Sequence, residues 1–114
     1  MRTPKILTPE SQVKRDVMQI LEALRIPAKR LNSGAARMKG FWVKFGFDGC
    51  PDIVCFFNDG RTGWIECKAK DGKDEMGEDQ LEFQAMCKER RIPHIVAYSS
   101  FDVENWLVKE GVLK

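Results

Sequence analysis

Residues 51–68 read PDIVCFFNDGRTGWIECK, two apolar stretches joined by turn-forming residues. The connection Asn58-Asp59-Gly60 is typical of a β-hairpin, so residues 52–57 and 62–69 are predicted to form two antiparallel strands. Each strand carries a carboxylate at its end remote from the turn. Because a hairpin brings such positions together, this stretch decides both the fold and the place where chemistry is expected.

The length of the hairpin loop determines whether the two carboxylates meet. A two-residue turn would place Asp52 opposite Cys67 and leave Glu66 on the other face of the sheet. A three-residue loop of residues 58–60 places Asp52 directly opposite Glu66, and its last position commonly needs positive φ, which Gly60 can adopt. We therefore predict an odd loop and two carboxylates close enough to share a cation; another odd loop or a β-bulge would also serve.

The side chains on this face suit phosphodiester hydrolysis. Two hard carboxylates on neighbouring strands favour Mg²⁺ or Mn²⁺, which prefer oxygen ligands. Lys68 projects from the same face as Glu66, where it can orient or deprotonate an attacking water and offset phosphate charge. The alternative is an ordinary polar face with a surface Glu–Lys pair. The short, otherwise apolar strand favours the catalytic interpretation.

The rest of the chain predicts an α/β fold in the order α-β-β-β-α-β-α, a three-layer sandwich on a mixed sheet. Thr8-Pro9-Glu10 begins a first helix, whose apolar stripe reaches Leu24 before Pro27 ends it. The other expected elements are a short strand at 29–32, a small-residue loop at 33–36, a strand at 41–45, a helix at 78–91, a strand at 93–98 buried on both faces, and a last helix capped by Ser99 or Ser100. The apolar side of the helix at 78–91 is expected to consist of Leu81, Phe83, Met86 and Cys87.

Composition narrows the class of protein. The 114 residues are 43% hydrophobic and 32% charged, which indicates one folded domain over residues 1–114. No stretch resembles a membrane span or a signal peptide, so a cytoplasmic, non-secreted protein is expected. His94 is the only histidine, which excludes histidine-based metal triads and is expected to be structural. The four cysteines form no CxxC pair and are expected to pack as small core residues.

Charge is distributed unevenly along the chain. Residues 1–50 hold ten Lys or Arg and four Asp or Glu, whereas residues 51–114 hold nine and thirteen. A basic segment preceding an acidic site suggests an anionic partner such as DNA, although an uneven solvated surface would look the same. The candidate DNA contacts are Lys29, Arg30, Arg37, Lys39, Lys44 and Lys70. Phe41 and Trp42 lie among them, and we expect at least one of these aromatic side chains to be buried.

Together, Pro51-Asp52 and Glu66-Cys67-Lys68 resemble the PD-(D/E)xK nuclease signature. Nearly the whole chain is similar to the stand-alone VRR-NUC (virus-type replication-repair nuclease) module of phages and DNA-repair enzymes. Further points of resemblance are Glu10 on the first helix, the segment Asn32-Ser33-Gly34, the turn Gly49-Cys50-Pro51-Asp52, and Gln80 on the helix after the Glu-x-Lys strand. One departure is Gly77, where a serine often stands three residues before that glutamine.

The resemblance implies a restriction-endonuclease-like core and a divalent-metal-dependent endodeoxyribonuclease similar to Holliday junction resolvases. It implies catalytic roles for Asp52, Glu66, Lys68, Glu10 and Gln80, and metal ligation by Asp52, Glu66, Glu10 and the backbone carbonyl of Cys67. It adds Ser33 to the DNA contacts. The implied cofactor is Mg²⁺ or Mn²⁺. The implied partner is branched DNA, with the four-way junction as the first candidate substrate, and the implied active form is a homodimer.

Several alternatives stay open. Glu10 can serve only to complement the helix dipole. Gln80 can bond Lys68 or a loop carbonyl, or face solvent. Phe101, Trp106 and Leu107 of the last helix can form a dimer interface or pack within the monomer. There are two competing functions. One is a non-catalytic DNA-binding or assembly module of the same fold, and the other is a sequence-specific restriction-type nuclease.

Overall fold

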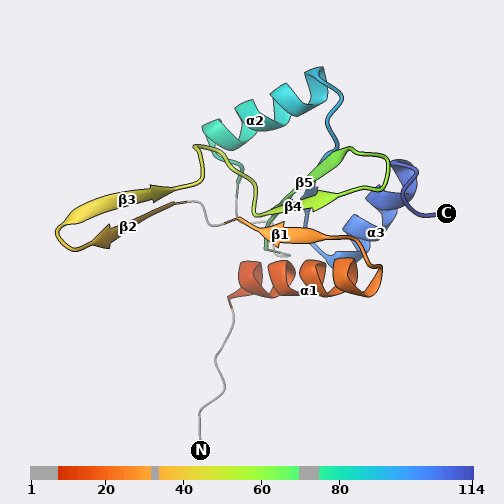
Figure 1. Ribbon diagram of the computed structural model, residues 1–114, viewed down its shortest axis with the longest axis horizontal. Helices are drawn as coiled ribbons and strands as arrows, with labels where there is room; N and C mark the ends of the chain where they lie inside the picture. Colours follow the sequence, from red (N-terminus) through yellow and green to blue (C-terminus); the bar gives the residue numbers. More distant parts are fainter. Residues whose placement is uncertain (1–7, 32–33, 70–74) are drawn as a thin grey trace, which may run out of the picture.

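The computed structural model describes residues 8–31, 34–69 and 75–114, with the backbone alone for 34–38 and 42–45. Its elements follow in the order α1 (Pro9–Ala23), β1 (Ala28–Arg30), β2 (Gly34–Met38), β3 (Phe41–Phe45), β4 (Ile53–Phe56), β5 (Thr62–Cys67), α2 (Glu78–Glu89), β6 (His94–Ala97) and α3 (Ser100–Lys109), as Figure 1 shows. Thr8 caps α1, because its hydroxyl accepts a hydrogen bond from the Ser11 N–H at 3.1 Å.

The main sheet has four strands in the order β1-β4-β5-β6. Its first three strands are antiparallel, and β6 pairs with β5 in parallel after the α2 crossover. An α/β fold with a mixed sheet, flanking helices and a C-terminal helix is thereby confirmed. The elements α1, β1, β4, β5, α2, β6 and α3 follow one another as α-β-β-β-α-β-α, and the expected strand at 41–45 is β3, part of an additional β2–β3 hairpin between β1 and β4.

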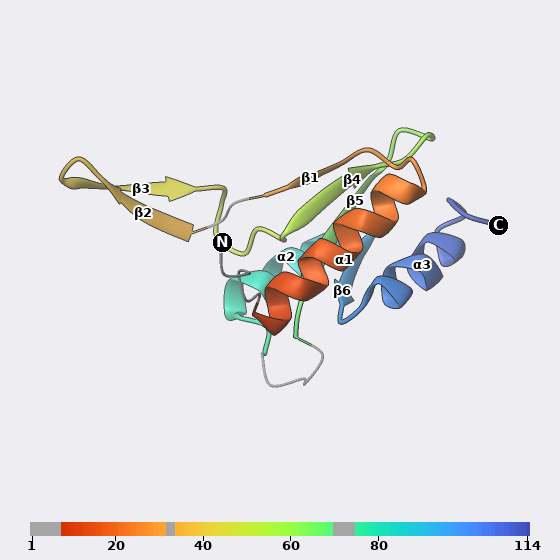
Figure 2. The same cartoon turned by 90° about the horizontal axis from the view of Figure 1, so that it is seen from below.

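Helices cover both faces of this sheet. α1 and α3 lie on one face and α2 lies on the other (Figures 1 and 2). Apolar residues of α1, α3 and the inward positions of the strands form the core on the first face: Val13, Val17, Leu21, Ile53, Cys55, Ile65, Cys67, Val103 and Leu107 are all at most 1% exposed. None of the helices in the described ranges is long and apolar enough to cross a membrane.

The β4–β5 hairpin has the predicted register. Ile53 is opposite Ile65 and Phe56 is opposite Thr62, so Asp52, one position beyond the ladder, lies level with Glu66. The Phe57 N–H donates to the Arg61 carbonyl at 2.9 Å, which closes a loop of residues 58–60. Gly60 has φ +90°, as the last position of such a loop requires.

The β2–β3 hairpin corrects one prediction. Gly34–Ala36, expected within a loop, belongs to strand β2, which pairs only with β3 in a separate two-stranded sheet. The hairpin projects from the body of the molecule (Figure 1). Its turn residues Lys39 and Gly40 both have positive φ, at 44° and 88°, as in a type I′ turn. Pairing across this turn overrides the weak strand preference of glycine and alanine.

Two other predictions about burial are wrong, and an alternative left open for the last helix is decided. β6 is an edge strand, so Ile95 and Val96 are only partly buried instead of being covered on both faces. Leu81, expected on the apolar side of α2, is 49% exposed because only one edge of that helix meets the sheet. On α3, Trp106 and Leu107 pack inside the monomer, which removes them from a dimer interface, whereas Phe101 is 66% exposed.

Candidate active site

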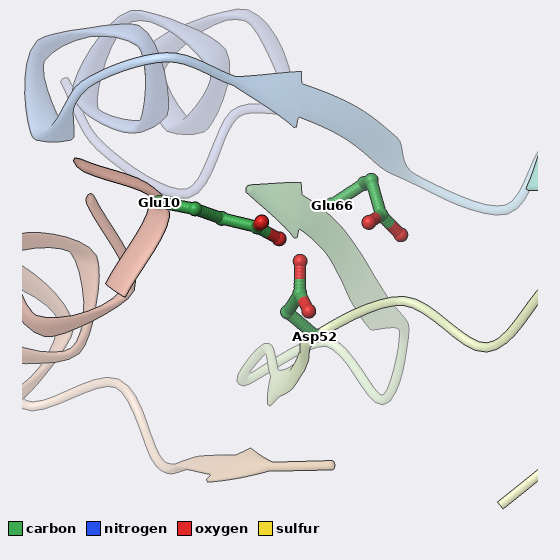
Figure 3. Close-up of side chains that lie close together, drawn as sticks. All are labelled: Glu10, Asp52 and Glu66. Atoms are coloured by element: carbon green, nitrogen blue, oxygen red, sulfur yellow. The ribbon is translucent and has the colours of Figure 1, made fainter. Parts of the chain in front are cut away.

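Three carboxylates from three different elements meet at one end of the main sheet. Glu10 comes from the first turn of α1, Asp52 directly precedes β4, and Glu66 lies on β5 (Figure 3). Each offers a carboxylate oxygen, and these oxygens all lie within 4.8 Å of one another. Asp52 is 9% exposed and Glu66 2% exposed, which is unusual for acidic residues without a partner. The predicted proximity of Asp52 and Glu66 is confirmed.

Backbone hydrogen bonds from two strands hold Asp52 in place. The Cys67 N–H donates to Asp52 Oδ2 at 2.7 Å, and the Asp52 N–H donates to the Ile65 carbonyl at 3.1 Å. On the other side, the Leu31 N–H donates to the Asp52 carbonyl at 2.7 Å. Two of these bonds come from β5 and the third from Leu31, directly after β1, so both the backbone and the carboxylate of Asp52 are fixed against the sheet.

Gln80 connects Glu66, Lys68 and the start of α2. Its side-chain amide donates to Glu66 Oε1 at 2.9 Å, while its Oε1 accepts from Lys68 Nζ at 3.3 Å and from the Gly77 N–H at 2.8 Å. Lys68 Nζ also donates to the Glu75 carbonyl at 3.4 Å. The predicted bond between Gln80 and Lys68 is confirmed. Gly77 offers no capping side chain, so Gln80 satisfies the exposed backbone donor of this helix start itself.

A close backbone contact sets the position of α2. Gly49 has φ +78°, and a Cβ built there would lie 2.2 Å from the Asp79 carbonyl oxygen in the first turn of α2. Only glycine allows this approach, which brings the turn preceding Asp52 against the helix that carries Gln80. The Gly-x-Pro-Asp turn therefore has a structural role beside its proximity to the carboxylates.

The carboxyl groups of the site are crowded and largely buried. Burial, and next the charge of Asp52, raise the pKa of Glu66 from 4.5 to about 8, while Lys68 acts in the opposite direction. Two lysines, Lys14 and Lys68, face three carboxylates. Three clustered carboxyl oxygen donors fit a divalent cation such as Mg²⁺ or Mn²⁺, whose charge would favour the ionised form of Glu66. Glu10, Asp52 and Glu66 are the side chains that would hold it.

Metal ligation by Glu10 and by the Cys67 carbonyl stays a prediction. Glu10 lies in the cluster, yet its position in the first turn of α1 also suits the helix dipole. The Cys67 peptide lies at the site, because its N–H bonds Asp52, and ligation by its carbonyl stays a prediction.

Lys14 is a residue of the site that the sequence analysis missed. Its Nζ lies 3.2 Å from Asp52 Oδ1 and 3.8 Å from Glu10 Oε1. The available signal was its position four residues after Glu10, which places both on one face of α1. The contact with Asp52 is long-range and needed the packing of α1 on the sheet to become visible.

The thiols and His94 are structural in this arrangement. All four cysteines are free and buried, as expected, and burial raises the pKa of Cys55 to about 11 and of Cys67 to about 12. Such thiols are not nucleophiles near neutral pH. His94 packs at 5.9 Å from the Phe83 ring, and burial lowers its pKa. Chemistry at this site therefore depends on carboxylates and lysines.

The predicted DNA contacts fall into two groups. Lys29 and Arg30 are exposed on β1, and their backbone pairs with Val54 and Ile53 of β4, the strand that follows Asp52. Arg37, Lys39 and Lys44 belong to the β2–β3 hairpin, with Lys39 exposed in its turn. Ser33 and Lys70 lie outside the described residues.

At least one of Phe41 and Trp42 is expected to be buried, and the structure describes the side chain of Phe41. Phe41 is 58% exposed, so it is not part of the core. The side chain of Trp42 is outside the described part of the chain.

Comparison of the chain with protein-family models, with curated proteins and with solved structures found no match.

Proposed function

We propose that this protein is a divalent-metal-dependent endodeoxyribonuclease that hydrolyses phosphodiester bonds in branched DNA. The observation that carries the proposal is the cluster of Glu10, Asp52 and Glu66, with two buried carboxylates and the Lys68 ammonium held beside them by Gln80. A surface Glu–Lys pair, the competing interpretation, would not need a buried network of this kind.

The residues of the site divide the work of hydrolysis. Glu10, Asp52 and Glu66 would hold the cation, which when bound stabilises the negative charge that develops on the phosphoryl group. Lys68 is 7% exposed and fixed by its bonds to Gln80 and the Glu75 carbonyl, so its ammonium can offset phosphate charge or orient the attacking water. Gln80 is hydrogen-bonded to both Glu66 and Lys68, so it fixes the distance between their side chains and acts as a positioning residue.

The basic residues support DNA as the substrate. β1 carries Lys29 and Arg30 and ends beside Asp52, where the Leu31 N–H bonds the Asp52 carbonyl. The β2–β3 hairpin then extends from the same end of the molecule as the start of α1 (Figure 1). A phosphate backbone lying along these bases would pass the carboxylates.

The preference for branched DNA and the homodimer rest on the resemblance to VRR-NUC modules. A four-way junction needs two cuts, and two active sites related by a two-fold axis can deliver them. Of the three α3 residues considered for an interface, Phe101 is the one that is exposed. A dimer mass in light scattering at micromolar concentration, with and without DNA, is expected.

A cleavage panel tests the proposal. Wild type, Asp52→Asn and the control Glu22→Gln are incubated in Mg²⁺ or Mn²⁺ with a four-way junction, a flap, a splayed arm and a plain duplex. Glu22 is exposed on α1, so its variant removes one carboxylate outside the site. We expect metal-dependent cutting of branched DNA by wild type and Glu22→Gln only. Equal cutting by Asp52→Asn, or DNA binding by wild type without cleavage of any substrate, would refute a nuclease at this site.

A further inference from the structure

Lys14 occupies the side of Asp52 that a metal ion would need. The Asp52 carboxylate has two oxygens, and Oδ2 already accepts the Cys67 N–H at 2.7 Å. Oδ1 lies 3.2 Å from Lys14 Nζ, which is also 3.8 Å from Glu10 Oε1. The ammonium thus lies between two of the three carboxylates of the cluster, in the position that a divalent metal ion would occupy.

This ammonium is able to leave while its helix stays in place. Val13 and Val17 on either side of Lys14 are buried in the core, so α1 is fixed against the sheet. The Lys14 side chain is 24% exposed and that of Glu10 37% exposed, so this side of the cluster is open to solvent. A lysine stem is flexible and this ion pair is reached by solvent from the Lys14 side, so the ammonium can withdraw from Asp52 without movement of the helix.

We propose, on the basis of the function proposed above, that Lys14 is the resident counter-cation of the carboxylate cluster. A divalent ion displaces its ammonium from Asp52 and Glu10, and the freed ammonium then binds a phosphate oxygen of the DNA. Binding of metal and binding of DNA are thereby coupled, because the lysine cannot serve the carboxylates and the phosphate at once. Coupling of this kind is reciprocal, so DNA also tightens metal binding.

A purely structural ion pair makes the opposite prediction for metal affinity. If Lys14 only held Asp52 and Glu10 in position, its removal would loosen the cluster and weaken metal binding. If Lys14 competes with the metal, its removal strengthens metal binding. The sign of the change in affinity therefore separates the two roles.

The first experiment measures Mn²⁺ affinity without DNA, by electron paramagnetic resonance of free Mn²⁺, for wild type, Lys14→Gln and Arg15→Gln. Arg15 is exposed on the same helix, so its variant removes an equal charge outside the cluster. We expect Lys14→Gln to bind Mn²⁺ at least about threefold more tightly, with Arg15→Gln within about twofold of wild type. Unchanged or weaker binding by Lys14→Gln would overturn the inference. Absence of Mn²⁺ binding by wild type would instead overturn the proposed function, and the inference with it.

The second experiment compares affinity for a four-way junction in Ca²⁺ and in EDTA. We expect Ca²⁺ to raise the affinity of wild type and Arg15→Gln at least about threefold more than that of Lys14→Gln, since only the first two have the ammonium to release. An equal gain in all three proteins would contradict the hand-over to phosphate. Lys14→Met, which keeps an unbranched apolar stem, is measured in parallel, and circular dichroism confirms that each variant is folded.

Discussion

The chain contains two β-hairpins that differ in their surroundings. The β4–β5 hairpin is embedded in the four-stranded sheet, with helices on both faces and a three-residue loop. The β2–β3 hairpin forms its own two-stranded sheet and has a two-residue turn. The first carries Asp52 and Glu66, and the second carries three of the predicted DNA contacts.

The difference in packing matches the difference in the proposed roles. Metal ligation needs oxygens fixed within a fraction of an ångström, which strands buried on both sides can provide. Contact with a phosphate backbone depends on charge and tolerates movement, so an isolated hairpin is sufficient. We therefore expect substitutions in the embedded hairpin to affect catalysis or folding, and substitutions in the projecting one to affect DNA affinity.

The largest effect is expected on cleavage. Glu66→Gln and Lys68→Ala should each lower the rate of cutting at least about a hundredfold, because the first removes a ligand of the cation and the second an ammonium that offsets phosphate charge. Only Glu66→Gln should also weaken Mn²⁺ binding, as measured by calorimetry. The exposed Lys88 of α2 provides the control Lys88→Ala, which should cut at the wild-type rate. Full activity of Lys68→Ala would remove this residue from the mechanism.

A pair of glycine substitutions compares the two hairpin regions in stability. Gly49→Ala and Gly40→Ala both place a side chain at positive φ, but only at Gly49 would the Cβ collide with backbone, whereas nothing lies within 4 Å at Gly40. We expect urea unfolding to show a loss of about 2–4 kcal/mol for Gly49→Ala and about 1 kcal/mol for Gly40→Ala. Equal losses would mean that the contact with α2 does not constrain the site.

Removing the bases of the projecting hairpin should weaken DNA binding without affecting metal binding. The triple variant Arg37→Gln, Lys39→Gln, Lys44→Gln loses up to three phosphate contacts. Its plot of log K against log salt should therefore be shallower by about 2 to 3 than that of wild type, whose slope we expect near −4 to −5. Fluorescence anisotropy over a salt series measures both slopes. An unchanged slope together with unchanged affinity would show that the hairpin does not contact DNA.

The smallest effect is expected on the pH dependence of stability without metal. Because the pKa of Glu66 rises to about 8 in the folded chain from 4.5, its ionisation opposes folding over that interval. The melting temperature of wild type in EDTA should thus fall as pH rises from about 5 to about 8, and Glu66→Gln should reduce this fall. Glu22→Gln serves as control and should keep the wild-type profile.

The sequence was sufficient to predict the features that depend on neighbouring residues. Loop length and Gly60 together fix the register of the β4–β5 hairpin, and register alone determines that Asp52 and Glu66 share a face. The same holds for the cap of α1, where Thr8 and Pro9 form a local signal. Such predictions succeed because alternating strands and helix starts follow from short-range geometry.

Features that depend on packing could not be predicted in this way. Strand β2 begins with the small residues Gly34, Ala35 and Ala36 and forms because β3 pairs with it across the Lys39-Gly40 turn. The contact of Lys14 with Asp52 requires α1 to lie on the sheet beside the start of β4. The exposure of Leu81 likewise depends on which part of α2 meets the sheet.

The metal site can be tested with a crystal structure of the protein grown with Mn²⁺, with diffraction recorded at the manganese absorption edge. We predict an anomalous peak about 2 Å from carboxylate oxygens of Asp52 and Glu66, with Glu10 bound directly or through water. We also predict that Lys14 Nζ has moved away from Asp52 Oδ1. An Mn²⁺-soaked crystal with no peak at these carboxylates would contradict a metal site there, and with it the nuclease proposed for this chain.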